Sequence, residues 1–159
     1  MSVNKIATLG KVDSVDFAIY LNKKAGELRK SVNVTKIQKW LYICYGLYLA
    51  VYHEQLLTER PRAWQYGPAF PLVYKIQKKH GNSLDNLQNT LPSKEIEKYD
   101  KLIHATLINF GEWTASELVA WTHEKDKAWD RTIQLEGEYA TMDNHDIFLD
   151  FQNLMCNKL

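Results

Sequence analysis

The stretch from Trp40 to Tyr52 constrains the fold more than any other part of the chain, because every residue in it except Gly46 is apolar or aromatic. A surface helix carries a single apolar stripe, so a helix that is apolar all round has neighbours on every side. The run is shorter than the roughly 20 apolar residues that a helix needs to cross a bilayer. The sequence therefore predicts a central core helix. Glycine in a helix interior costs about 1 kcal/mol relative to alanine, and we expect Gly46 to allow the close approach of another backbone.

The residues on either side of this run predict where the helix begins and which elements come after it. Thr35 and Gln38 have the spacing of a capping box, which places the helix start at Thr35. Downstream, the alternation of Trp64 and Tyr66 favours a short extended segment. The pair at 67–68, Gly-Pro, then marks a turn.

Helical periodicity and capping signals predict further helices before and after this corner. They cover about residues 14–30, 71–80, 93–110, 114–122, 127–136 and 143–155. Ser14 is the predicted N-cap of the first helix, and Thr114 with Glu117 forms a second predicted capping box. The predicted fold class is all-α: one domain over residues 1–159, mainly helical around the central helix, with a short β-hairpin or extended corner near 56–67. Residues 1–13 carry no pattern and are expected to form a loosely ordered arm.

Charge is distributed unevenly, although the net charge of the chain is only +1. Residues 1–110 carry 16 Lys or Arg against 9 Asp or Glu, whereas residues 111–159 carry 4 against 10. A sequence pI near 7.7 is not the basic footprint of a nucleic-acid-binding domain. The predicted helices on either side of Gly111 resemble half of a helix-turn-helix, but the second one is acidic and unsuited to DNA. We therefore do not expect nucleic acid as a partner. Without a signal peptide or a membrane span, we expect a cytoplasmic protein with no membrane contact.

The sequence gives no positive support for an enzyme. The five histidines lack metal-ligand spacing, and Cys44 and Cys156 are too few and too far apart for a metal site or a disulfide framework. Phosphate-binding loops, dinucleotide fingerprints and nucleophile elbows are missing from the sequence. We predict no catalytic, cofactor-binding or metal-binding residue. Catalysis by His123 would need a nearby carboxylate or nucleophile, and a structural histidine at a helix C-terminus is the preferred interpretation.

Two blocks of residues, in the same order along the chain, carry a resemblance to a known family. The first block comprises Gln38, Leu41, Tyr42, Trp64, Tyr66, Gly67, Pro68 and Pro71. The second comprises Thr122, His123 and Trp129. With these blocks the chain resembles the Panacea domain, a family that includes SocA-like antitoxins and phage-associated GepA-like proteins, over about residues 15–151. The family usually places a small β-branched residue after the Gly-Pro pair, whereas Ala69 and Phe70 stand here, which leaves the local surface and the choice of partner open.

The resemblance implies an antitoxin of a bacterial or prophage toxin–antitoxin system. Such a protein would neutralise a cognate protein toxin, encoded by a neighbouring gene, by direct binding. If the toxin is delivered for proteolysis, a cytoplasmic protease would be a further partner. Two alternatives remain: a phage-encoded adaptor or inhibitor of a host protein, and a DNA-binding autoregulator. The family residues would be structural or partner-binding. Interface candidates are aromatic and acidic side chains: Tyr66, Phe70, Tyr74, Glu117, Glu124 and Asp126.

Overall fold

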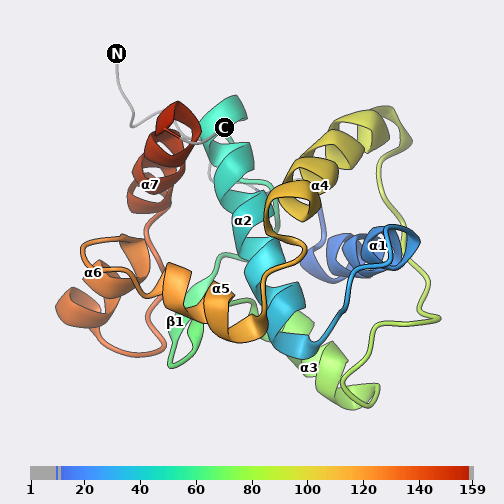
Figure 1. Ribbon diagram of the computed structural model, residues 1–159, viewed down its shortest axis with the longest axis horizontal. Coiled ribbons are helices and arrows are strands. Elements are labelled where there is room, and N and C mark those ends of the chain that lie inside the picture. The colour runs from blue at the N-terminus through green and yellow to red at the C-terminus, as the bar shows by residue number, and fades with distance from the viewer. Residues whose placement is uncertain (1–9, 11, 158–159) are drawn as a thin grey trace.

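The computed structural model describes residue 10 and residues 12–157, and its helices are arranged around one central helix (Figure 1). In chain order the elements are α1 (Ser14–Glu27), α2 (Val34–Tyr52), β1 (Arg62–Trp64), β2 (Gly67–Ala69), α3 (Pro71–Lys79), the short 3₁₀ helix η1 (Ser93–Glu95), α4 (Ile96–Phe110), α5 (Ala115–Thr122), α6 (Ala128–Glu136) and α7 (Asn144–Asn157). Strands β1 and β2 form an antiparallel hairpin in which Trp64 pairs with Gly67. The prediction of an all-α fold with a small hairpin is confirmed. No helix in the described part of the chain is long and apolar enough to cross a membrane.

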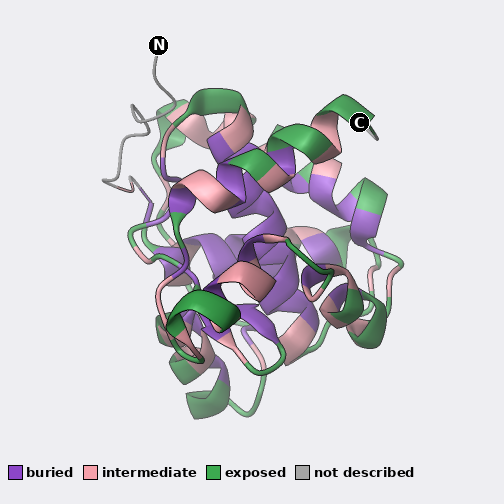
Figure 2. Ribbon diagram, turned by 90° about the vertical axis from the view of Figure 1, so that its left-hand side faces the viewer, coloured by how far each residue is buried: buried purple, intermediate pink, exposed green. Residues whose placement is uncertain are grey.

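Helix α2 is the core element that the sequence predicted. All of its residues from Lys36 to Leu49 are buried, and Figure 2 shows it as the buried centre of the molecule. Helices α7 and α4 pack along opposite sides of α2, and α5 crosses it (Figure 1). A Cβ atom at Gly46 would overlap the ring of Phe151 on α7. Glycine is therefore needed for close packing, but an aromatic ring fills the space rather than the backbone expected from the sequence.

The start of α2 differs from the prediction. Asn33 is the N-cap, and its side chain accepts a hydrogen bond from the backbone N of Lys36 at 2.8 Å. The predicted capping box of Thr35 and Gln38 is therefore wrong, and Gln38 makes tertiary contacts instead. The first helix shows a smaller error, since Asp13 rather than Ser14 caps α1.

Two further local predictions had different outcomes. The capping box of Thr114 and Glu117 is present at the start of α5, with both reciprocal hydrogen bonds formed. Val12, near the end of the arm predicted over residues 1–13, is part of the core and only 2% exposed. Its backbone N donates to the Leu56 carbonyl at 3.2 Å and its carbonyl accepts from Thr58 at 2.8 Å. Residues 1–9 and 11 of that predicted arm lie outside the described part of the chain.

Candidate functional site at the hairpin and helix α5

The turn between β1 and β2 brings the two predicted sequence blocks together. Gly67 adopts a φ of +105°, a conformation that L side chains rarely adopt. A Cβ atom there would also come within 2.6 Å of Thr122 Oγ1 and 2.9 Å of Lys39 Cε. Thr122 is itself buried and donates its hydroxyl to the Val119 carbonyl of its own helix at 2.8 Å. The turn therefore sits directly on α2 and α5, with no room for a side chain.

Gln38 attaches the exit of the hairpin to the central helix. Its Oε1 accepts from the backbone N of Phe70 at 2.7 Å, and its Nε2 faces the Phe70 carbonyl at 3.3 Å and Gln77 Oε1 at 3.1 Å. Gln38 and Gln77 are both buried, at 3% and 1% exposure. Buried polar groups are expensive unless they are bonded, and here one amide satisfies both backbone groups of Phe70. This family residue has a structural role.

Lys39 lies beneath the turn, and no sequence motif had singled it out. Its side chain is 3% exposed, and its Nζ donates to the Pro68 carbonyl at 3.0 Å. Burial lowers the pKa of this amine from 10.5 to about 7. The one sequence signal is a lysine placed between Ile37 and Trp40 at the start of an apolar helix. A neutral amine is a nucleophile, but the Lys39 side chain is buried beneath the turn.

His123 and Trp129 cover the other side of the turn. The rings stack with centroids 3.7 Å apart and an interplanar angle of 11°. Trp129 Nε1 donates to the Trp64 carbonyl at 2.8 Å, which links α6 to β1. Burial and the nearby charge of Lys39 lower the pKa of His123, while a hydrogen bond with the Gln65 backbone opposes that shift. His123 is the C-cap residue of α5, and its Nε2 is buried without a hydrogen-bond partner among the residues that the structure describes.

These contacts agree with the structural interpretation of His123, since its partners are a ring and a backbone group rather than a carboxylate. The other family residues are also enclosed: Leu41 and Tyr42 are buried in α2. Pro71 is the first residue of α3. Among the described residues, no group of three His, Cys, Asp or Glu side chains could hold a metal ion.

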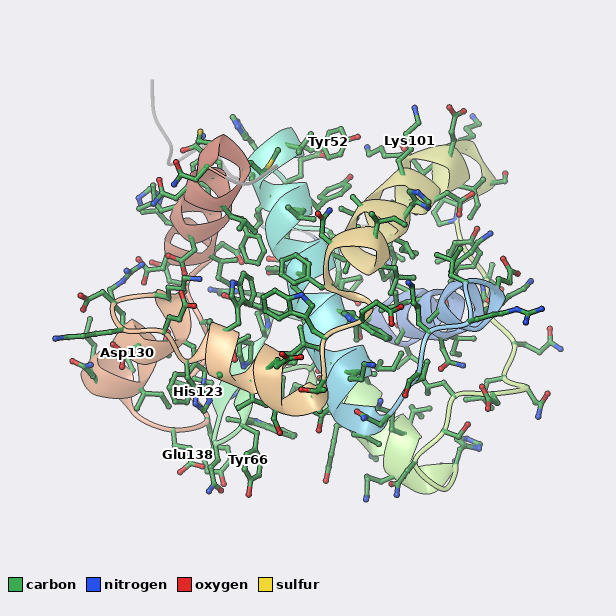
Figure 3. The ribbon with its side chains drawn as sticks, in the orientation of Figure 1. Tyr52, Tyr66, Lys101, His123, Asp130 and Glu138 are labelled. Carbon is green, nitrogen blue, oxygen red and sulfur yellow. The ribbon has the colours of Figure 1, made fainter. Side chains whose placement is uncertain are left out.

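Exposed aromatic rings surround this buried cluster. Tyr66 is 65% exposed at the tip of the hairpin, and Figure 3 shows it at the same end of the molecule as His123. Tyr139 is 60% exposed and has a φ of 73°, in the left-handed region. The ring centroid of Trp64 lies 5.2 Å from that of Tyr74 and 6.5 Å from that of Tyr139. We call Trp64, Tyr66, Tyr74 and Tyr139 the hairpin face.

The structure separates the predicted interface candidates. Phe70 is completely buried, so its side chain is not available to a partner, and that expectation is corrected. Tyr74 is half-buried, and Glu117 is exposed but holds the α5 capping box through Thr114. Glu124 and Asp126 are exposed, and Glu124 pairs with Lys127 at 2.9 Å. Contact of Tyr66, Tyr74 or these acidic residues with a partner stays a prediction.

A known family matches the part of the chain that contains this cluster. The family described as "Antitoxin SocA-like, Panacea domain" matches residues 37–130, which include the hairpin, Gln38, Lys39, His123 and Trp129. The chain belongs to this family. Among curated proteins it is 27% identical over 130 residues to Antitoxin SocA of Caulobacter vibrioides (strain NA1000 / CB15N), an alignment that covers 75% of this chain and 69% of that protein. No solved structure matches the chain significantly.

Proposed function

We propose that the chain neutralises a cognate protein toxin by direct, non-covalent binding in the cytoplasm, and that it acts without catalysis. The observation that carries this proposal is how the family residues are used. Gln38, Gly67 and Thr122 are buried. Gln38 accepts a hydrogen bond from Phe70 at the exit of the hairpin, and Gly67 lies directly against Thr122 of α5. They stabilise the domain, so contact with a partner is left to the exposed side chains around them. Membership of an antitoxin family supports a toxin as that partner.

The charge around α5 supports a protein partner rather than DNA. Residues 112–130 hold five Asp or Glu and two Lys. Glu112, Glu117 and Glu124 are exposed along this stretch and would repel phosphates. The same charges favour association with a basic protein by electrostatic steering. A DNA-binding autoregulator therefore ranks below a protein binder.

Co-expression with the neighbouring open reading frame tests the proposal. We expect the neighbour to be toxic alone, harmless with this chain, and recovered with it as a stable complex on size-exclusion chromatography. Rescue could also occur without a stable complex, with a toxin level that recovers in a protease-deficient host. That result would show that the chain delivers the toxin for proteolysis rather than blocking it by binding. A neighbour that is harmless alone would contradict the antitoxin proposal. A pull-down would then test the alternative of a host protein as target.

A further inference from the structure

A groove of about 490 Å³ opens between α5 and the C-terminal ends of α4 and α7. We call it the α4–α7 groove, and its lining includes Asn109, Phe110, Trp113, Trp121, Asn153 and Leu154. Its volume is within the range of ligand and peptide pockets. Helix α5 separates it from the hairpin: Trp121 lines the groove, whereas Thr122, the next residue, lies against Gly67.

The floor of the groove is a continuous row of aromatic rings. Phe110 lies 5.0 Å from Trp113 and 5.2 Å from Trp121, measured between ring centroids. The indole N–H of Trp129 at the hairpin donates to the Trp64 carbonyl, but no described residue accepts from the indole N–H of Trp113 or Trp121. Tryptophans of this kind, half-buried with an open donor, are enriched at protein interfaces.

The rim of the groove carries two carboxylates, Glu124 and Asp150, and one cation, Lys127, which already lies against an indole ring. Lys127 Nζ lies 4.4 Å from the centre of the Trp121 ring and 2.9 Å from Glu124 Oε1. Asp150 faces the same groove, and burial raises its carboxyl pKa, while a hydrogen bond from the Ala128 backbone N opposes the shift. The contact of Lys127 shows that a cationic side chain fits between a tryptophan face and a carboxylate here. The surrounding stretch, residues 112–130, has a net charge of −3.

Resting on the proposed function, we propose that the α4–α7 groove binds a segment of the cognate toxin that places an apolar or aromatic side chain between flanking Lys or Arg residues. The apolar side chain packs on the floor of Phe110, Trp113 and Trp121. The flanking cations meet the rim carboxylates. Acceptor groups of the segment, such as its backbone carbonyls, accept hydrogen bonds from the indole N–H groups of Trp113 and Trp121. A basic segment is specified because the charge of the rim complements it.

A pair of adjacent substitutions on α7 tests the location. Asn153 and Gln152 are both exposed, but only Asn153 lines the groove as described. Asn153→Arg places a long cation in the groove without removing any core contact, and Gln152→Arg adds the same charge on a different side of the helix. We expect Asn153→Arg to weaken toxin binding about 30-fold and to abolish rescue, as loss of an interface hot spot does. Gln152→Arg should stay within about 2-fold of the wild type.

A third variant tests the charge of the segment. Glu124→Lys changes an exposed rim residue, and we expect binding about 5-fold weaker at low ionic strength, with the difference shrinking as salt is added. Unchanged or tighter binding by Glu124→Lys would overturn the basic segment. Unchanged binding by Asn153→Arg would overturn the groove itself, most clearly if Tyr66→Ala with Tyr139→Ala on the hairpin face lost binding instead. If the wild-type chain neither rescues nor binds, the proposed function fails and this inference falls with it.

Discussion

The buried residues around the hairpin turn and the α4–α7 groove lie on opposite sides of helix α5, and both sites contain tryptophan. At the hairpin, Trp129 is stacked and its N–H is bonded to a backbone carbonyl. In the groove, Trp113 and Trp121 are half-buried and open. The comparison separates buried family residues such as Gln38, Gly67 and Thr122, which make contacts within the domain, from the open aromatic rings of the groove, which we propose as the partner surface. Four changes can break or sharpen this comparison.

Replacing Gln38 by leucine should have the largest effect on stability. Gln38→Leu leaves the backbone N of Phe70 and the Oε1 of Gln77 without their buried partner, while the Phe70 carbonyl keeps its hydrogen bond from the Tyr74 backbone N. Each lost partner of this kind costs roughly 1–3 kcal/mol, so the free energy of unfolding should fall by about 4 kcal/mol. Urea denaturation measures it, with Gln65→Leu at an exposed position of the hairpin turn as the control. A fall below about 1 kcal/mol would contradict a structural role for Gln38.

Two glycines with positive φ form a matched pair. Gly67→Ala meets both backbone strain and the neighbouring Thr122 and Lys39, whereas a Cβ at Gly137, with a φ of +94°, meets nothing within 4 Å. We expect Gly67→Ala to lower the unfolding free energy by about 3 kcal/mol and Gly137→Ala by about 1 kcal/mol. Thermal unfolding of the two variants decides the matter. Equal losses would mean that the turn is not tightly seated on α2 and α5.

The buried amine of Lys39 predicts a pH-dependent effect. Its folded pKa, about 7, lies below the ordinary value of 10.5. At this site the unfolded chain therefore binds more protons between these values, so the contribution of Lys39 to the free energy of unfolding rises with pH across that window. Lys39→Met removes this dependence, so the free energy of unfolding of the variant relative to the wild type should be higher at pH 7 than at pH 9.5, by about 3 kcal/mol. His123 is mostly neutral at both pH values because its pKa is lowered from 6.5. Urea denaturation at both pH values measures the difference in unfolding free energy between Lys39→Met and the wild type. An equal difference at the two pH values would show that Lys39 is not desolvated.

The smallest expected effect compares the tryptophans themselves. Trp129→Phe loses the hydrogen bond to the Trp64 carbonyl, whereas Trp113→Phe loses none to a described residue. The unfolding free energy should therefore fall by about 1 kcal/mol more for Trp129→Phe than for Trp113→Phe. Calorimetry on the two variants measures this difference. A larger loss for Trp113→Phe would make the groove part of the scaffold rather than a surface for binding.

The outcome of each sequence prediction depends on the range of the interactions involved. The central helix was predicted because its apolarity is continuous, and the capping box of Thr114 and Glu117 because its bonds are local. The same spacing at Thr35 and Gln38 misled, because Gln38 is used by Phe70, 32 residues away. Local sequence patterns cannot reveal which polar side chain forms a hydrogen bond with a backbone group far away in the sequence.

The candidate site shows the same limit. The sequence indicated His123 and Trp129, but their stacking on each other appears only in the folded chain. Lys39 was missed because a lysine is usually exposed, and its burial depends on the Pro68 carbonyl above it. Phe70 was expected on the surface because aromatic residues mark interfaces, yet it is fully buried. The α4–α7 groove depends on the packing of three helices and has no local signature.

Hydrogen–deuterium exchange of the chain, alone and in complex with the neighbouring toxin, tests the central claim most directly. We expect the toxin to slow exchange in α5 and in the C-terminal turns of α4 and α7, which surround the groove. Exchange in the hairpin, residues 62–69, should stay as it is in the free chain. Protection concentrated in residues 62–69 and 137–141, with none along α5, would contradict the account and place the toxin on the hairpin face.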